Sequence, residues 1–334
     1  MNQFSCADAC READEDIIGS GTNHSVYILI ECPFPWEYNA FESRFLPENL
    51  EVLMAAVNKS KLSIRFLLIT QNQNDRENNR KVLIYEQQQS SFLNGYKKYE
   101  FDVDSPEKIA PVIQKYLAGE NLNSYTLNTQ TRDLLVCTHG SHDKCCSKYG
   151  NPFYTEAKKI ISELGLKNTR IWKASHFGGH RFAPTMIDFP DGRYYGLLNG
   201  NSFRSILLRS GCIQSLKRVY RGWGILPTSI QVLERELMLR HGWEWFEHKI
   251  NLLHLDINSD KTVIKTELAV VQPNNSIYIC QAKLVKDENK TIRLKGSCGA
   301  TKESEFTKYY ISNLNFKIER KITEAIPIIQ KKAS

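Results

Sequence analysis

Short apolar runs alternate with polar segments over the first 120 positions and predict a small α/β unit. Val26–Glu31, Ser63–Thr70 and Lys81–Glu86 have the length and the β-branched and aromatic content of buried strands. Leu50–Val57 has the apolar spacing of a helix, and a second helix is expected over Ser105–Leu117. The predicted order is therefore β-α-β-β-α. It follows a polar, acidic lead-in of about 20 residues that we expect to be loose.

A second unit follows the polar stretch 121–130, which we interpret as a domain boundary. Its strands are predicted over Asp133–Cys137, Arg170–Ser175, Met186–Phe189 and Tyr194–Leu198. Its helices are predicted over Asn151–Gly165, where Asn151-Pro152 signals the start, and over Ser202–Arg209. The resulting order is β-α-β-β-β-α. Residues 138–150 are expected to form a polar, cysteine-bearing loop before the first of these helices.

The pattern changes again after a helix predicted over Thr228–Arg240. Beyond residue 241, short alternating or apolar runs are separated by polar turns, which is typical of an antiparallel sheet. The predicted fold class is therefore α/β (α+β), with two lobes of strands and helices and a C-terminal antiparallel β-rich module. We predict three domains, over residues 1–125, 126–241 and 242–334.

The composition is that of a globular protein and does not indicate a particular function. Hydrophobic residues make up 41% of the 334 and charged residues 24%, which is ordinary for a globular protein. The formal net charge of +7 is mild and no Lys/Arg tract stands out, so we expect no nucleic-acid partner. No apolar stretch approaches the roughly 20 residues of a spanning helix, and the N-terminus lacks a secretory pattern. We therefore expect a cytoplasmic protein without a membrane partner.

The nine cysteines and eight histidines are unevenly distributed. The segments CTHGSHDKCC (137–146) and ASHFGGHRFA (174–183) contain four of the histidines and three of the cysteines. Cys137 ends one predicted strand, and His176 follows the next. If those strands are parallel neighbours, both ends meet at one sheet edge and bring together Cys137, Cys146, His176 and His180.

Four sulfur and nitrogen donors at one edge are typical of a tetrahedral metal ion or an iron–sulfur cluster. The pattern leaves a structural zinc open, because zinc uses the same Cys2His2 set. Gly178 and Gly179 would let the main chain approach such a centre closely. Thiol exchange through the adjacent Cys145 and Cys146 is a further alternative. The remaining cysteines are expected to be structural thiols, with Cys6 and Cys10 as the first exceptions: Cys6, Cys10, Cys32, Cys212, Cys280 and Cys298.

These motifs resemble the sucrase/ferredoxin-like family, whose members look like thioredoxin-like [2Fe-2S] ferredoxins. The resemblance is carried by Val136-Cys137-Thr138-His139-Gly140 with Asp143 and Cys146, and by Ser175-His176-Phe177-Gly178-Gly179-His180 with Phe182-Ala183. The stretch Pro33-Phe34-Pro35-Trp36 is similar to a Pro-x-Pro-Trp element of bacterial members. The resemblance is sharp over residues 130–200, looser over 6–240 and faint beyond, where Ser297-Cys298-Gly299 is only suggestive.

The resemblance implies that residues 126–241 form a thioredoxin-like ferredoxin domain and that residues 1–125 form a similar lobe. It implies a [2Fe-2S] cluster bound by Cys137, Cys146, His176 and His180, with Cys145 as the alternative to Cys146. The surrounding residues expected to support the ligands are His139, Asp143, Gly178 and Gly179. This chain departs from the family at His142, where Arg is common, and at Ser147, where Gly is common.

Two neutral imidazoles in place of two thiolates make the oxidised cluster less negative, which raises its reduction potential and couples it to protons. The expected role is one-electron transfer or redox response with a partner protein, either a reductase or an electron acceptor. The alternatives are a zinc-stabilised thioredoxin-like binding module and a thiol-based redox protein. The chain has no Walker A loop, no G-x-G-x-x-G after a strand and no H-E-x-x-H. No motif supplies the carboxylate pair that glycoside hydrolysis would need.

Overall fold

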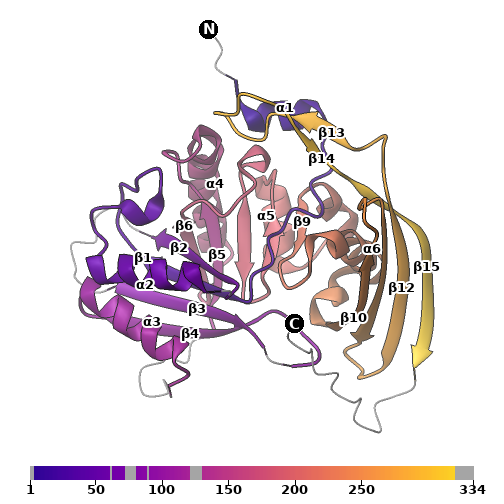
Figure 1. The fold of residues 1–334 in the computed structure, drawn as a ribbon, viewed down its shortest axis with the longest axis horizontal. Coiled ribbons are helices and arrows are strands. Elements are labelled where there is room, and N and C mark those ends of the chain that lie inside the picture. Colours follow the sequence, from indigo (N-terminus) through magenta and orange to yellow (C-terminus); the bar gives the residue numbers. More distant parts are fainter. Residues whose placement is uncertain (1–3, 61, 72–79, 89, 121–129, 320–334) are drawn as a thin grey trace.

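The computed structural model describes residues 4–60, 62–71, 80–88, 90–120 and 130–319 (Figure 1). Its main element is a nine-stranded mixed sheet with strand order β4-β3-β1-β2-β6-β5-β7-β8-β9. The strands of this sheet are β1 (Val26–Glu31), β2 (Ile64–Thr70), β3 (Arg80–Gln87), β4 (Tyr96–Val103), β5 (Arg132–Cys137), β6 (Thr169–Ala174), β7 (Met186–Phe189), β8 (Arg193–Tyr195) and β9 (Tyr220–Trp223).

Helices cover the faces of this sheet, and a separate antiparallel sheet lies toward the C-terminus. The α-helices are α1 (Cys6–Glu12), α2 (Glu48–Lys59), α3 (Ile109–Leu117), α4 (Lys144–Glu163), α5 (Gly200–Leu208) and α6 (Gln231–His241). The 3-10 helices are η1 (Ala40–Glu42), η2 (Pro106–Lys108), η3 (His180–Phe182), η4 (Ile213–Arg218), η5 (Thr228–Ile230) and η6 (Gly242–Glu247). The remaining strands are β10 (Lys249–Ile257), β11 (Val263–Val271), β12 (Ile277–Lys286), β13 (Ile292–Leu294), β14 (Ser304–Phe306) and β15 (Tyr309–Glu319).

A short antiparallel junction joins the two halves of the nine-stranded sheet. Strands β2 and β6 pair only through Ile69 with Ala174 and Thr70 with Lys173. Strands on both sides of the predicted boundary between residues 125 and 126 therefore belong to one sheet. The boundary itself falls at 121–129, outside the described residues.

The alternation along β1 divides its side chains between two apolar cores. Ile28 and Ile30 face α2 and α3 in one core, whereas Tyr27 and Leu29 lie in the other. On that second side Tyr27 meets Phe189 of β7 edge-on, with ring centroids 5.1 Å apart. Each such fully buried side chain contributes about 1.5–3 kcal/mol. The two halves of the sheet are thus packed onto each other as well as joined at an edge.

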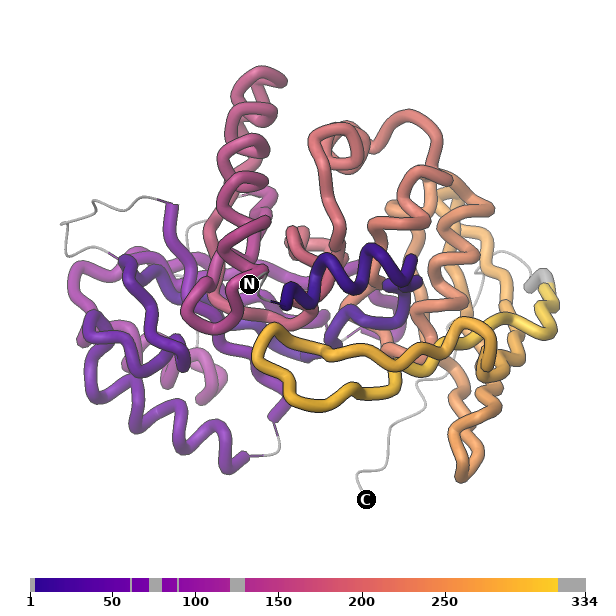
Figure 2. Tube along the Cα trace, turned by 90° about the horizontal axis from the view of Figure 1, so that it is seen from above, coloured from indigo at the N-terminus to yellow at the C-terminus, as the bar shows by residue number. Residues whose placement is uncertain are grey.

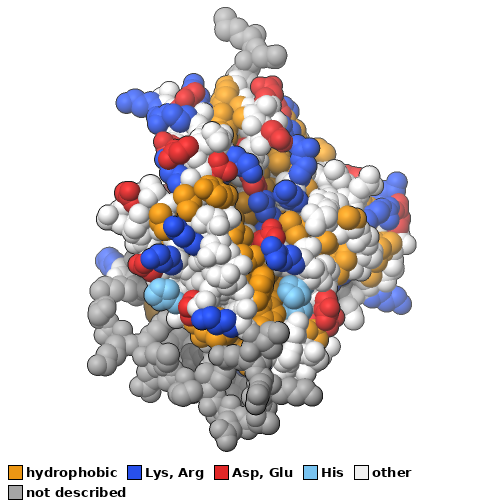
Figure 3. Space-filling model, turned by 90° about the vertical axis from the view of Figure 1, so that its right-hand side faces the viewer, with side chains coloured by type: hydrophobic (Ala, Val, Ile, Leu, Met, Phe, Trp, Pro, Cys, Tyr) orange, Lys and Arg blue, Asp and Glu red, His pale blue; other side chains and the backbone are white. Residues whose placement is uncertain are grey.

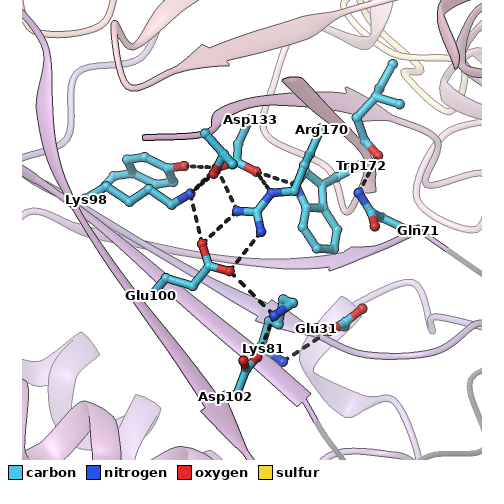
Figure 4. A network of polar contacts seen from close by, with 12 residues as sticks. Glu31, Gln71, Lys81, Lys98, Glu100, Asp102, Asp133, Arg170 and Trp172 are labelled. Atoms are coloured by element: carbon cyan, nitrogen blue, oxygen red, sulfur yellow. Dashed lines mark hydrogen bonds and ion pairs between the residues drawn. The ribbon is translucent and has the colours of Figure 1, made fainter. Parts of the chain in front are cut away.

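A buried network of charges links β4 to β5 and β6 on this inner side (Figure 4). Arg170 donates to both Asp133 and Glu100, at 2.7 and 2.8 Å. Lys98 lies 2.7 Å from Asp133 and 2.9 Å from Glu100. The Trp172 indole N–H also donates to Asp133. Because both carboxylates are almost completely buried, their charge depends on these partners.

The C-terminal sheet, in the order β10-β11-β12-β15, shares the larger core with α6. Leu233 and Leu237 of α6 are buried in the same cluster as Ile250, Leu268 and Cys280 of the sheet. Viewed from this side of the molecule, basic, acidic and apolar side chains are interspersed (Figure 3). The α/β class and the antiparallel C-terminal module are thus confirmed.

A segment from the N-terminal part of the chain and one from the C-terminal part meet above the nine-stranded sheet (Figure 1). Helix α1 lies beside the β13–β14 hairpin, as both ribbon views show (Figures 1 and 2). The expectation of a loose lead-in is wrong, because Cys6, Ala7 and Cys10 of α1 are buried. The acidic composition of this segment gave no apolar pattern from which the short helix could be predicted. Its small apolar face is covered by segments that are distant in the sequence.

Two further corrections concern the elements around the site. Helix α4 begins at Lys144, seven residues before the predicted start at Asn151, and Pro152 lies inside it. Strand β4 was not predicted, since its lysines and acidic residues obscure the alternation that buries Tyr96, Glu100 and Phe101. Among the described residues, none of the helices combines the length and apolar character needed to cross a membrane.

Candidate metal centre

The parallel pairing of β5 with β6 creates the site. The register places Cys137 opposite Ala174, so Cys137 and His176 emerge at the same sheet edge. The condition that the two strands are parallel neighbours is thus met. Helix α4 closes over this edge, and Gly150 permits the approach: a Cβ there would lie 2.0 Å from the Cys137 carbonyl oxygen. A side chain at that position would force the helix away from the strand end.

The early start of α4 determines where its two cysteines point. Asp143 is the N-cap, and its Oδ1 accepts a hydrogen bond from the Cys145 N–H at 2.8 Å. Successive residues of a helix project about 100° apart. Cys145 and Cys146 therefore face different neighbours, although they are adjacent in the chain.

Three of the predicted donors converge at the β5 edge. His176 Nδ1 lies 3.8 Å from Cys137 Sγ and 3.6 Å from Cys146 Sγ. The ligand atoms of these three residues all lie within 4.8 Å of one another. The structure thus brings Cys146, rather than Cys145, beside Cys137 and His176.

The fourth predicted donor, His180, lies on η3 at the side of this group. Its ring stacks on that of His176, with centroids 4.9 Å apart. Its Nε2–H donates a hydrogen bond to the carbonyl oxygen of Gly296, and the two atoms lie 2.7 Å apart. Its Nδ1 is buried and has no hydrogen-bond partner in the described part of the chain. The ligand atoms of His180 group with those of His142 and His176, not with the two sulfurs. A buried nitrogen with a free lone pair still suits a metal ligand.

His139 supports this arrangement through its backbone contacts. Its Nδ1 accepts a hydrogen bond from the His176 N–H at 3.2 Å, and its Nε2 lies 2.7 Å from the Glu37 carbonyl oxygen. Trp36 packs edge-on against the His139 ring at 5.8 Å. The Pro-Phe-Pro-Trp stretch therefore holds His139, which in turn holds the main chain of His176. A supporting role for His139 stays a prediction.

His142 contacts the site but is not among the ligands or supporting residues expected from the sequence. Its ring stacks on His176 with centroids 4.1 Å apart, and its outer face stacks on Tyr38. It also forms a possible donor group with His176 and His180. His142 and His176 line a pocket of about 390 Å³, together with His139 and Arg65. The clustering of histidines in the sequence was the available signal.

The two glycines between the histidines adopt left-handed backbone conformations. Gly178 has φ of +95° and Gly179 has φ of +81°. A Cβ on Gly179 would lie 2.6 Å from the guanidinium of Arg221, which donates to the Gly178 carbonyl oxygen at 3.1 Å. Arg221 is buried, and burial lowers its pKa to about 10. No sequence motif marked Arg221 as a neighbour of this loop.

Burial and mutual hydrogen bonding set the charge of the donors. Burial lowers the pKa of His176 to about 2 and also lowers the pKa of His180, so both imidazoles are neutral at pH 7. Burial is the largest influence on Cys137 and opposes its ionisation, but the hydrogen bond from Cys146, the backbone at His139 and Phe177 and the charge of Arg221 together outweigh it and lower the pKa of Cys137. The hydrogen bond between the two thiols raises the pKa of Cys146. The group thus favours one thiolate and two neutral imidazoles, the forms that bind metal ions.

Cys145 belongs to a second group of sulfurs. Its Sγ lies 3.2 Å from that of Cys298 and 3.6 Å from that of Cys6. Asp143, expected to support the ligands, lies between the two groups: its Oδ2 is 4.0 Å from His180 Nε2, and its Oδ1 is 3.9 Å from Cys6 Sγ. Cys10, Cys32 and Cys280 are buried elsewhere and Cys212 is exposed.

The fold and this group of donors define an α/β protein with a candidate metal centre at a sheet edge. A family model described as sucrase/ferredoxin-like matches residues 17–222, and the chain belongs to that family. The matched range contains Cys137, Cys146, His176 and His180 but neither Cys6 nor Cys298. Among solved structures, a thioredoxin-like [2Fe-2S] ferredoxin from Aquifex aeolicus is similar at 15% identity, covering 30% of this chain and 97% of its own, with a TM-score of 0.24. The comparison with curated proteins gave no match.

Proposed function

We propose that the protein binds a [2Fe-2S] cluster through Cys137, Cys146, His176 and His180 and acts in one-electron transfer. The observation that carries the proposal is the buried Nδ1 of His180, which has no hydrogen-bond partner among the described residues. The His180 ring stacks on His176, whose Nδ1 faces the sulfurs of Cys137 and Cys146. A buried imidazole nitrogen left without a partner costs roughly 1–3 kcal/mol. Metal ligation removes that cost and uses the donor set present.

The bound cluster would supply a one-electron redox couple, and the residues around it set the conditions for that couple. His180 keeps its proton on Nε2 because this N–H donates a hydrogen bond to the Gly296 carbonyl oxygen. His176 faces the sulfurs through Nδ1, which leaves Nε2 as the nitrogen that holds or releases a proton. Deprotonation of His180 Nε2 would break its hydrogen bond to the Gly296 carbonyl. Deprotonation of His176 Nε2 would break no such bond to any residue that the structure describes. We therefore expect the proton coupled to electron transfer to reside on His176.

The surface near His176 is the proposed contact for a redox partner protein. His142 and Tyr38 cover His176 from one side, and Arg65 donates to the His176 carbonyl oxygen at 2.8 Å. The pocket in front of them opens toward solvent, whereas Cys137 and Cys146 are buried. An electron donor or acceptor would approach the histidine side, because the thiolates lie behind the sheet edge.

The direct test is the colour and metal content of the purified protein. A [2Fe-2S] centre gives red-brown protein with visible absorption, two iron atoms per chain and an EPR signal after reduction. The His180→Ala variant should lose most of this absorption, whereas the exposed His254→Ala variant should keep it. Colourless protein without iron after expression in iron-rich medium and anaerobic purification would refute the proposal.

Zinc at the same four residues is the second candidate, because a closed Cys2His2 set is a common structural zinc site. A structural zinc would make the protein a binding module instead of an electron carrier. One zinc per chain bound by two sulfurs and two nitrogens, with no iron, would support this candidate. Thiol exchange between Cys145 and Cys146 is less favoured, since their sulfurs face different groups.

A further inference from the structure

Three cysteines from distant parts of the chain meet on the far side of Asp143. Cys6 opens α1, Cys145 lies in the first turn of α4, and Cys298 lies in the loop between β13 and β14. Their sulfurs form a triangle with sides of 3.2, 3.6 and 3.6 Å. Cys6 and Cys145 are fully buried and Cys298 is half-buried.

A carboxylate completes the group. Asp143 Oδ1 lies 3.9 Å from Cys6 Sγ, and its two oxygens accept backbone N–H bonds from Cys145 and Cys298, at 2.8 and 2.9 Å. These bonds fix the carboxylate in the anionic form and leave lone pairs free on both oxygens. The ligand atoms of the four residues all lie within 4.8 Å of one another.

The sulfur separations fit a metal ion better than a disulfide. A disulfide bond is about 2.05 Å long and joins only two of three sulfurs. Four ligands around zinc, with Zn–S bonds of about 2.3 Å, hold sulfurs roughly 3.7 Å apart. Without a metal, these three clustered thiols would have only weak S–H hydrogen bonds to one another.

A hydroxyl donor offsets part of the negative charge of such a site. The Ser5 hydroxyl, at the N-cap of α1, lies 3.4 Å from Cys145 Sγ. Cys145 also lies in the first turn of α4, a 20-residue helix whose N-terminus favours negative charge. Hydrogen bonds of this kind stabilise thiolates and help to hold them as ligands.

We propose that Cys6, Cys145, Cys298 and Asp143 form a second metal site, which binds a structural zinc ion. On binding, three thiols release their protons to solvent and the zinc ion takes four protein ligands, which leaves no open position for catalysis. The proposal does not depend on the iron–sulfur assignment, because the two sets of ligands do not overlap.

The position of this site gives it a consequence for the first one. The loop that carries Cys298 also provides the Gly296 carbonyl oxygen, which accepts a hydrogen bond from His180 Nε2. Helix α1 and this loop come from opposite ends of the described chain and lie side by side (Figure 2). Zinc at Cys6, Cys145 and Cys298 would therefore fix the loop that orients His180.

The test is metal analysis of the full chain expressed with iron and zinc supplied and purified without oxygen. Wild-type protein should contain one zinc per chain, separately from any iron. Cys6→Ser and Cys298→Ser should each lose most of the zinc and keep the iron and visible spectrum. Cys10→Ser, on the same helix as Cys6 but in contact with Glu15, is the matched control and should keep both metals.

Zinc X-ray absorption of the wild-type protein tests the same proposal without a substitution. Three sulfurs and one oxygen are expected in the zinc shell. Two sulfurs and two nitrogens would instead assign the zinc to Cys137, Cys146, His176 and His180 and would overturn the proposal. It would equally fail if the purified protein had no zinc, or had a disulfide among the three cysteines. Loss of iron alone would count against the proposed function and leave this site standing.

Discussion

Cys145 and Cys146 are adjacent in the chain, yet their sulfurs lie in different groups: Cys146 Sγ is 3.6 Å from His176 Nδ1 and Cys145 Sγ is 3.2 Å from Cys298 Sγ. The start of α4 at Lys144 produces this division, because the first helical turn rotates the two side chains apart. One dipeptide thereby contributes to two possible metal sites, with Asp143 between them.

This division predicts opposite results for two serine substitutions. Cys146→Ser should lose most of the visible absorption and iron, because it removes a sulfur beside His176. Cys145→Ser should retain the absorption, since its sulfur faces Cys6 and Cys298. Iron content and absorption of the two variants, purified in parallel, provide the measurement. If Cys145→Ser loses the chromophore and Cys146→Ser keeps it, the assignment of the ligand is wrong.

His139 should affect cluster retention without being a ligand. Replacing His139 by Ala removes the acceptor for the His176 N–H and the contact with Glu37. Loss of such a supporting hydrogen bond typically weakens metal binding about 10–100-fold. The rate of iron loss to a chelator should rise accordingly, while the freshly purified variant still shows the wild-type absorption bands. His254→Ala is the control, and an equal rate of iron loss in both variants would argue against the role given to His139.

Replacing both proposed histidine ligands by cysteine should change the redox couple in a defined direction. In the His176→Cys/His180→Cys variant, four thiolates make the cluster more negative, so the reduction potential should fall. The wild-type potential should decrease with rising pH, by about 59 mV per unit where one proton accompanies one electron. The variant has no imidazole ligand and should show no slope near neutrality. Potentiometric titration at several pH values measures both effects, and an unchanged slope would exclude imidazole ligation.

Arg170 should be necessary for the junction between the sheet halves. Arg170→Met removes a cationic partner of Asp133 and Glu100, both almost completely buried, while Lys98 stays near both and Lys81 near Glu100. Breaking a buried ion pair typically costs about 3–5 kcal/mol, and we expect a free energy of unfolding lower by about 3 kcal/mol. Urea denaturation of this variant and of Arg218→Met, whose pair with Asp14 is exposed, provides the comparison. Similar losses in the two variants would contradict the importance of the network.

The same network predicts a loss of stability in acid. Burial alone would raise the pKa values of Glu100 and Asp133, but hydrogen bonds and charge from Arg170 and Lys98 outweigh it and lower both. Their stabilising contribution is therefore fully present above the unfolded-state pKa values of about 4 and is lost as the pH falls below them. The urea midpoint should decrease from about pH 5 downward. It should decrease less in Arg170→Met, because the pKa values of both carboxyl groups are then closer to their unfolded values.

Local patterns were sufficient for most of the elements around the site. The apolar runs of β5 and β6 end at Cys137 and Ala174, and the sequence showed where each strand stops. Cys137 and His176 could therefore be placed together on the condition that the two strands pair in parallel. The start of α4 could not, because the polar run from His142 to Ser147 has no apolar period, and the N-cap bond of Asp143 with Cys145 exists only once the helix has formed.

The sequence by itself determined the fold class, the sheet edge and the set of residues offered there, because strand and helix periods are local properties of the chain. Only the tertiary structure decided which of two adjacent cysteines faces the histidines. It also decided that Cys6, Cys145 and Cys298 meet, since contacts across 139 and 153 positions leave no periodic trace in the sequence. Such contacts depend on how α1 and the loop before β14 pack against α4, and that packing is set by the whole core.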